Sequence, residues 1–562
     1  MPNLASLAQR WARAEYAQTI DPSVSAATHV SMATGAYPGS TGQVSDRFHL
    51  SKDAFYWGTN GFEEPQMQVE PLWRTAMRNG LTTATVFWPG THTWMRDVLA
   101  DYAVAYGAGQ VPSALHVITP TEASEWQDAP SSYSPLLAAT LTIGGRDVEL
   151  GTKLYLLGAD STDDQEENYD TFFLCGEKRV DDDSVSLDIG ELTPFPVRSG
   201  WHAVAYFKLL GATSERIEVF QSALRQAEAR PVELFWEIDE KFGFLPAPPD
   251  SLALQRGWIT AQEYWEMAER HTQWLAQVIT YVSTTYQPDL TFAWLGVIHE
   301  CSQQFLMVDE RQPDYSEEMA QAFAEYVRAA YTLADESLGK LLNILLLGKD
   351  TVFVVSDHGT APIHSEVNVN TLLEQAALLQ HDEASDSAVE MAQSKALGFA
   401  RGAAVHVYIN LEGREQSGIV PIEDYGSVQD AIMDALQGAS DTDGKPVFAR
   451  VLRRKELSAL HLDSPNSGDV FAQASLGYML TDRLGNQNAI QPAPYYGQDG
   501  YDSTWPEMHA ILIAAGYGIR PGVRLQAVHL LDVVPTAASL LRVKPVEAAQ
   551  GRVLEEMLQD RP

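Results

Sequence analysis

Two adjacent polar residues in the middle of the chain stand where α/β proteins commonly carry out chemistry. Residues 351–355, Thr-Val-Phe-Val-Val, form an unbroken apolar run, which predicts a strand buried on both faces of a parallel sheet. Asp357 and His358 follow at the carboxyl end of that strand, where open α/β sheets bind ligands. A carboxylate beside an imidazole can supply two ligands to one metal ion, and Gly359 lets the backbone turn sharply next to them. An ordinary strand-end turn with a surface Asp-His pair is the alternative, and the pattern alone leaves both open.

A second candidate is the hydroxyl of Ser25. Small residues from 23 to 28 lead into a predicted helix with Val30 and Ala33, which Gly35 closes. A hydroxyl at the start of such a helix lies in the positive end of the helix dipole, as a nucleophile or phosphate site requires. The commoner role of a residue such as Ser25 or Thr28 is only to cap the helix.

Regular elements must hold these residues in place. Helical patterns over residues 316–347 and 369–379 flank the apolar run, so the local order is helix, strand, helix. The first residues predict a helix whose apolar face carries Leu4, Leu7, Ala8 and Trp11. Another amphipathic helix is predicted over residues 260–282, and its aromatic stripe indicates core packing.

Length and composition limit the class of protein. The 562 residues are too many for one compact core, so two or three lobes are expected. With 38 Lys and Arg against 75 Asp and Glu, the net charge of −37 argues against nucleic acid or an anionic membrane as partner. No apolar run is long enough to span a bilayer, and the start does not resemble a signal peptide. Cys175 and Cys301 alone cannot form a disulfide framework, which favours a cytoplasmic location.

Taken together, the Ser-Asp-His-Gly sequence after the apolar run and Ala-Thr-Gly-Ala-Tyr-Pro near the start resemble the alkaline phosphatase superfamily. The resemblance is to its nucleotide pyrophosphatase/phosphodiesterase (type I phosphodiesterase) branch, and it extends over most of the chain. Further matches follow in the family's order, at residues 2–8, 70–76, 86–90, 288–290, 500–509 and 531–541. Each match is weak alone, but their order predicts the fold.

The resemblance implies an α/β fold: a doubly wound, mostly parallel sheet flanked by helices. We expect five segments. The alkaline phosphatase-like core spans residues 1–129, 211–380 and 489–562. A β-rich inserted lobe spans residues 130–210, and a smaller α+β lobe spans residues 381–488. Short strands are predicted in the inserted lobe at 139–143, 154–157, 171–174, 185–189 and 203–209. The smaller lobe has a predicted strand at 405–410, a helix at 428–436 and a hairpin around 469–480.

Members of this family hydrolyse phosphate esters with two divalent metal ions, commonly zinc, which bridge a Ser or Thr nucleophile. Carried over to this sequence, the resemblance places Ser25 at the nucleophile position. It makes Asp357 and His358 ligands of the metal on the nucleophile side.

The remaining site positions depart from the family pattern. Asp46 aligns with an Asn that contacts the phosphate. His299 and Gln303 align with an Asp and a His of the second metal, and Asp499 aligns with its last His. Gln303 offers only a neutral carbonyl and is a poor zinc ligand, whereas His299 and Asp499 can still coordinate. The resemblance therefore implies a divalent metal, zinc by preference, at one site only or at neither.

Two functions follow from these changes. One is a pseudoenzyme: a family fold with a degraded or re-ligated site, with weak or no family-type activity and a protein partner. The other is an active metal-dependent phosphodiesterase or phosphatase with Ser25 as nucleophile and a phosphoester or nucleotide as substrate. The retained Ser25, Asp357 and His358 favour the enzyme, but the concentration of changes in one pocket outweighs them, so the sequence predicts the pseudoenzyme and leaves the enzyme as the alternative.

The family's first strand, which ends in a metal-binding Asp, precedes the helix at residues 2–8. The sequence begins at Met1, directly on that helix. Losing an inner strand leaves unpaired backbone groups that cost on the order of 1–3 kcal/mol each. We expect a truncation, after which the changes at Asp46, His299, Gln303 and Asp499 would follow. The alternatives are a start upstream of Met1, another segment in the slot, or a sheet closed over it.

Overall fold

The computed structural model describes residues 1–559 except 96, 108–109, 145–150, 199–201, 383–388, 486–487 and 546. It has two compact units, Met1–Tyr102 with Ile279–Pro562, and Ala103–Val278. Both strands and helices build the first unit, as the predicted α/β class requires. Two units are a coarser division than the five predicted segments, whose boundaries stay a prediction.

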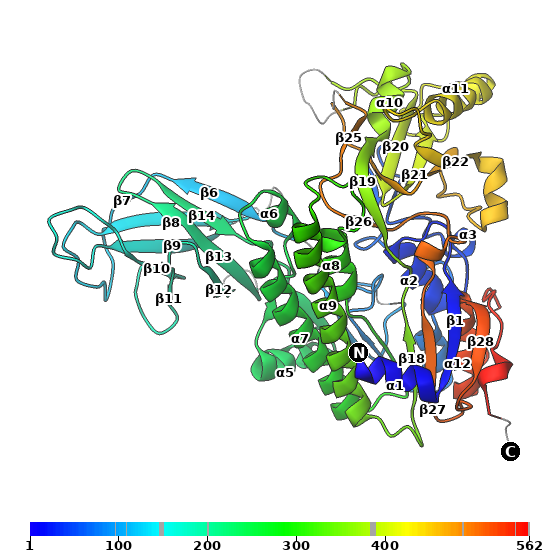
Figure 1. Cartoon of the computed structure of the whole chain (residues 1–562), viewed down its shortest axis with the longest axis horizontal. Helices are drawn as coiled ribbons and strands as arrows, with labels where there is room; N and C mark the ends of the chain where they lie inside the picture. Colours follow the sequence, from blue (N-terminus) through cyan, green and yellow to red (C-terminus); the bar gives the residue numbers. More distant parts are fainter. Residues whose placement is uncertain are drawn as a thin grey trace. The chain divides into compact units, whose positions relative to one another are not determined.

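One four-stranded sheet of the first unit brings together segments from both ends of the sequence. Its strand order is β18-β27-β1-β28. β1 (Ala12–Gln18) runs antiparallel to β27 (Leu512–Gly516) and parallel to β28 (Arg524–His529). Figure 1 shows β1 in blue beside the orange and red strands from the end of the chain. The mixed sheet therefore fixes the start of the chain, which leads into Ser25, against the C-terminal segment.

The predicted environment of residues 351–355 is wrong in two respects. These residues form β18 (Thr351–Val355), which pairs antiparallel with β27 and stands at the end of the sheet order. All five residues are half-buried. β17 (Leu290–Ala293) is also half-buried and also stands at the end of its sheet order, although it pairs in parallel, with β4 (Thr83–Val86). Within the described residues, no strand pairs with the other edge of β17 or β18. An apolar run does not reveal how many strands will flank it, because that depends on distant segments.

Helices pack against this sheet as the apolar patterns predict. α1 (Pro2–Arg10) places Leu7 in a cluster with two residues of β27, and α9 (Glu317–Ile344) adds Leu338 and Leu342 to it. The backbone N–H of Leu4 donates to a carboxylate oxygen of Asp335 at 2.7 Å. This contact satisfies a free N–H at the start of α1 with a favourable negative charge.

The second sheet system of the first unit differs from the sequence prediction at one point. β20 (Ala396–Arg401), β21 (Ala404–Ile409), β23 (Val470–Ala474) and β22 (Phe448–Arg453) form an antiparallel sheet in that order. β24 (Gly477–Thr481) instead pairs in parallel with β19 (Ala361–Asn368), so the hairpin predicted around 469–480 is wrong. Gly477 has a φ of 95°, and the chain passes there from one sheet to the other. Two short strands joined by a turn look like a hairpin in sequence, although each finds its partner elsewhere.

The remaining helices of the first unit are short or pack beside the sheets. They are α2 (Ser25–Thr34), α3 (Pro38–Thr41), α4 (Leu72–Arg78), α8 (Val297–Phe305), α10 (Val369–Gln375), α11 (Tyr425–Gln437) and α12 (Val533–Leu541). Further strands of this unit are β2 (Arg47–Phe48), β3 (Thr59–Asn60), β25 (Ile490–Pro492) and β26 (Gly497–Gln498).

Antiparallel sheets dominate the unit Ala103–Val278. One has the order β11-β10-β9-β8-β7, where β7 is Thr121–Glu122. Another has the order β12-β13-β14-β6, with β12 (Leu192–Val197), β14 (Ile217–Gln221) and β6 (Ala114–Ile118). The predicted strands correspond to β8 (Leu137–Ile143), β9 (Thr152–Ala159), β10 (Thr171–Cys175), β11 (Val185–Ser186) and β13 (Ala203–Ala212). α7 (Ala261–Thr285) begins in this unit and buries Trp274, Leu275 and Val278, as its pattern predicts. Among the residues that the structure describes, no helix combines the length and apolar character needed to cross a membrane.

Candidate active site

Ser25 is the first residue of α2, and its side chain does not cap the helix. Val24 is the N-cap and makes no side-chain capping bond, while every other residue of α2 is buried. Ser25 is only partly buried, and its Oγ lies 3.0 Å from Nε2 of His358. The hydroxyl therefore faces the side chains that follow β18, at the positive end of a helix dipole. This is the position that a nucleophile for an anionic substrate needs.

His358 is the central contact of the site. Its Nδ1 donates to the carbonyl oxygen of Gly359 at 2.8 Å, which directs Nε2 toward the other side chains. Nε2 lies 3.1 Å from Oδ2 of Asp357 and 3.6 Å from Oδ2 of Asp499. Glycine at position 359 allows the backbone at Glu507 to approach closely, because a Cβ on residue 359 would lie 2.0 Å from the carbonyl oxygen of Glu507.

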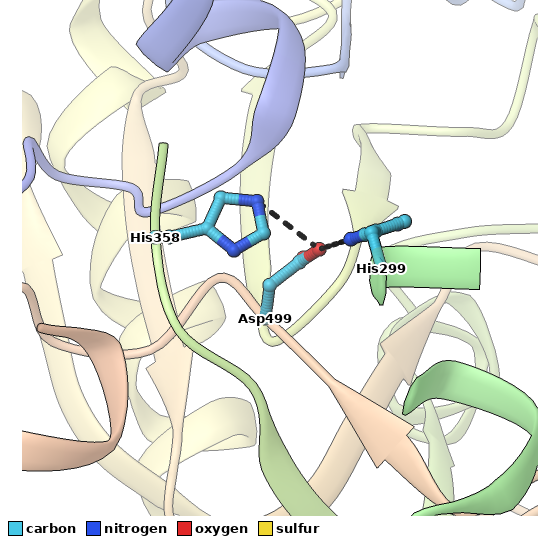
Figure 2. Close-up of side chains that lie close together, drawn as sticks. All are labelled: His299, His358 and Asp499. Carbon is cyan, nitrogen blue, oxygen red and sulfur yellow. Dashed lines mark ion pairs between the residues drawn. The ribbon is translucent and has the colours of Figure 1, made fainter. Parts of the chain in front are cut away.

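His299 and Asp499 approach His358 from two other segments. His299 belongs to the first turn of α8, and its Nδ1 lies 3.8 Å from Oδ2 of Asp499. Asp499 follows β26, and Figure 2 shows its carboxylate between the two imidazoles. Ligand atoms of His299, His358 and Asp499 all lie within 4.8 Å of one another, and we call these residues the metal triad.

The metal triad fits a divalent ion on geometric grounds. Zinc binds imidazole nitrogen and carboxylate oxygen at about 2.0–2.2 Å, so two ligand atoms of a tetrahedral ion lie about 3.4 Å apart. The two ion pairs to Asp499 are only slightly longer, at 3.6 and 3.8 Å. Two His and one carboxylate also form a typical ligand set that leaves one coordination position open. The triad unites residues that the family resemblance assigned to two separate metals.

The predicted ligand Gln303 comes from the same helix as His299. It lies one helical turn after His299 on α8, and its side-chain amide approaches Oε1 of Gln498 at 3.5 Å. Its backbone carbonyl accepts from the N–H of Tyr496 at 2.9 Å. The structure therefore places Gln303 beside the segment that carries Asp499.

Electrostatics bind the centre of the site together. Burial disfavours the charged form of His358, but the carboxylates of Asp357 and Asp499 outweigh it and raise the pKa of His358 to about 10. Burial also disfavours the Asp357 carboxylate, yet His358 and then His29 outweigh that effect and lower its pKa. The pKa of His299 is lowered, chiefly by burial. Without a metal ion, His358 is thus an imidazolium at neutral pH and cannot accept the proton of Ser25.

Asp46 closes another side of the site. Its Oδ1 accepts from the backbone N–H of Ala26 at 2.7 Å, within the first turn of α2. Burial, and then the charge of Asp499, raise the pKa of Asp46 to about 7, although Arg401 opposes the rise. The residue predicted to contact substrate is therefore held beside the nucleophile by a backbone hydrogen bond.

Sequence reasoning missed two residues of the site, His29 and Arg401. His29 lies one turn after Ser25 on α2, and its Nδ1 contacts the Ser25 carbonyl oxygen at 2.8 Å and Oδ2 of Asp357 at 3.5 Å. Its spacing of four residues from the serine was the available signal. Arg401, at the end of β20, had no comparable signal, because only the folded chain brings it near Asp46 and Asp499.

Comparisons with known proteins find relatives in sequence and in fold. The family model described as "Type I phosphodiesterase / nucleotide pyrophosphatase" matches residues 1–164 and 211–502. Venom phosphodiesterase 2 of Crotalus adamanteus is 28% identical over 148 residues, which are 24% of this chain and 16% of that protein. Ectonucleotide pyrophosphatase/phosphodiesterase family member 3 of Mus musculus is 25% identical over 138 residues, 24% of this chain and 15% of that protein. The chain thus covers only a small part of the length of these curated relatives.

A solved structure supports the fold. Murine ectonucleotide pyrophosphatase/phosphodiesterase 5, an inactive variant in complex with AMP, has a TM-score of 0.50 and 12% identity. The similarity covers 99% of this chain and 94% of the murine chain. At this identity the comparison concerns the fold alone.

Proposed function

Because the chain belongs to the type I phosphodiesterase/nucleotide pyrophosphatase family, we propose that it hydrolyses phosphoric esters with Ser25 as the nucleophile and one divalent ion in the metal triad. The substrates that we propose are small phosphodiesters or nucleotide pyrophosphates, the classes named in the family's description. The observation that carries the proposal is the hydrogen-bonding distance of 3.0 Å between Ser25 Oγ and His358, a member of the metal triad. The nucleophile and the metal ligands therefore share one site.

The chain's own groups account for the orientation and charge of the nucleophile. The first turn of α2 places positive dipole charge at Ser25, which stabilises an alkoxide on Oγ. The Gly359 carbonyl fixes the orientation of the His358 ring, so Nε2, the nitrogen that would bind the ion, lies next to the same oxygen. After Ser25 releases its proton to solvent, Oγ bonds to phosphorus and the leaving-group oxygen departs; water then cleaves the Oγ–phosphorus bond.

A divalent ion bound by the metal triad would supply charge neutralisation for the phosphoryl oxygens. The pocket needs such a charge, because Asp46, Asp357 and Asp499 all lie close to the serine or to His358. Three carboxylates alone would repel a phosphate.

One specific observation favours a pseudoenzyme as the second candidate function. His358 Nε2 already has Ser25 Oγ, Asp357 and Asp499 as neighbours, so the metal-free site is internally paired. A site that stays in this state would bind partners or ligands without hydrolysing them.

Hydrolysis of bis(4-nitrophenyl) phosphate by metal-stripped and zinc-loaded protein separates the two functions. The enzyme proposal expects zinc-dependent release of nitrophenol that falls at least ~10³-fold in Ser25→Ala. Cys301→Ser is the control, because it changes a single side-chain heavy atom on the helix that carries His299 and leaves Ser25 in place. Unchanged turnover in Ser25→Ala would contradict the nucleophile assignment. No turnover by zinc-loaded wild type would favour the pseudoenzyme.

A further inference from the structure

The turn between β20 and β21 lies directly against the segment that carries Asp499. The backbone N–H of Ala403 donates to the Asp499 carbonyl oxygen at 2.8 Å. Gly402 has a φ of 66°, and a Cβ on it would lie 2.7 Å from Oδ1 of Asp499. Glycine is therefore needed at this turn for both conformation and space. The contact fixes Arg401, the last residue of β20, beside a member of the metal triad.

The side-chain pattern of β20 turns Arg401 toward the segment around Asp46. Residues two apart in a strand share a face, so Arg401 lies on the same face as Phe399. The Phe399 and His49 rings are stacked, with 5.8 Å between their centres, and the Arg47 guanidinium lies 5.8 Å from the centre of the Phe399 ring. The face that carries Phe399 and Arg401 is thus directed at residues 46–49.

The charge of Arg401 acts on the site from this position. It favours the ionised form of Asp46 and lowers the pKa of His299. Desolvation opposes the charged form of Arg401, but Tyr495, and then Asp46 and Asp499, outweigh it and raise the pKa of Arg401. Arg401 is therefore a permanent positive charge in a site otherwise rich in carboxylates.

The guanidinium nevertheless has no direct partner in the described part of the chain. No hydrogen bond from its side chain is formed there, and no described carboxylate oxygen lies within the 4.0 Å of a salt bridge. The Arg401 side chain is exposed to solvent, so its N–H donors are accessible to a ligand. By contrast, Arg47 pairs with Asp482 at 2.5 Å, and Arg450 pairs with Asp502 at 3.0 Å. A guanidinium offers five N–H donors in a planar fork that matches phosphate oxygens.

We propose that Arg401 is the anion-binding residue of this site, and that its guanidinium binds non-bridging phosphate oxygens of the substrate. This inference deepens the proposed function and rests on it for the identity of the substrate class. It gives the site a phosphate-binding charge that belongs to the protein and does not depend on the metal. It also explains how a pocket with three carboxylates can accept an anion.

Binding of inorganic phosphate tests the proposal without requiring turnover. Titration calorimetry on zinc-loaded wild type gives the reference affinity. Arg401→Ala is expected to weaken phosphate binding about 10- to 100-fold, since hydrogen bonds to charged groups carry energies of this order. Arg401→Lys should recover only part of the loss, because a single ammonium lacks the planar fork. Thermal unfolding and zinc content of each variant verify that the site is intact.

Arg47→Ala is the matched control. It removes the same charge from a neighbouring position, but its guanidinium already pairs with Asp482, so phosphate affinity should change less than about threefold. Equal phosphate affinity in wild type and Arg401→Ala, or no phosphate binding by wild type, overturns the proposal. A loss as large in Arg47→Ala as in Arg401→Ala also overturns it, since only general charge would then matter. Phosphate binding that depends on Arg401 in a protein without turnover would leave this proposal standing and refute the hydrolase.

Discussion

The buried carboxyl of Asp46 makes the stability of the metal-free protein depend on pH. Asp46 is 7% exposed, and its pKa rises from an ordinary 3.8 to about 7, mainly through burial and then through Asp499. Between about pH 4 and pH 7 the folded protein therefore keeps a proton that the unfolded chain has lost. Under this condition the free energy of unfolding falls as the pH rises.

The size of the effect follows from the shift. One pKa unit corresponds to about 1.4 kcal/mol, so a rise of about three units removes up to about 4 kcal/mol between pH 4 and pH 8. Asp46→Asn removes this titration. It keeps a side-chain carbonyl oxygen that can accept from the Ala26 N–H, which in the wild type donates to Asp46 Oδ1 at 2.7 Å. We expect the variant to be more stable than wild type at pH 8 by up to that amount and similar to it at pH 4.

Urea unfolding of metal-stripped protein at pH 4, 6 and 8 measures the difference. The first unfolding transition should be compared, because a chain with two compact units need not unfold in one step. Asp443→Asn is the matched control, since that side chain is 74% exposed and should show no pH-dependent gain. A stability difference between Asp46→Asn and wild type that is the same at all three pH values would refute the reasoning.

Three further predictions concern the metal triad and its support. Zinc uptake by metal-stripped protein at pH 8 should release about one proton from His358, because the pKa of His358 is about 10, and the zinc affinity should therefore rise with pH. A pH indicator in weak buffer measures the released proton, and a zinc affinity that does not change with pH would contradict the prediction. Gln303→His should tighten zinc binding about tenfold or more, because it adds an imidazole one turn after His299. Competition with a chromophoric chelator measures the zinc affinity, and an unchanged affinity would show that residue 303 cannot reach the ion. Gly359→Ala should destabilise the protein by about 1–3 kcal/mol or more, because the new Cβ would lie 2.0 Å from the Glu507 carbonyl oxygen. Gly348→Ala is the control, because a Cβ there meets nothing within 4 Å. Equal thermal midpoints of the two variants would show that the backbone at Gly359 relaxes freely.

The elements with strong local signals could be predicted from sequence. The helix periodicity at both α1 and α9, and the glycine that ends α2, gave these elements nearly at their observed bounds. The serine at the start of α2 and the Asp-His pair after β18 were found because their chemistry depends on neighbours in sequence. The structure places Ser25 Oγ and Asp357 Oδ2 each within hydrogen-bonding distance of His358 Nε2.

What depends on distant segments could not be predicted. The edge position of β18 is set by β27, which lies more than 150 residues later in the sequence. The grouping of His358 with His299 and Asp499 depends on the Gly359 carbonyl, which turns Nε2 toward them. Arg401 enters the site because its hairpin turn packs on Asp499, a contact between segments that show no common pattern.

A single zinc titration tests the central claim, that one metal ion and Ser25 act together in one site. Increasing zinc is added to metal-stripped wild type and Ser25→Ala, and bound zinc and bis(4-nitrophenyl) phosphate hydrolysis are measured on the same samples. We predict that wild-type activity rises with bound zinc and saturates at about one ion per chain, while Ser25→Ala binds the same zinc and stays inactive. Full activity in the stripped protein, saturation only at two ions per chain, or no activity at any zinc content would contradict the claim.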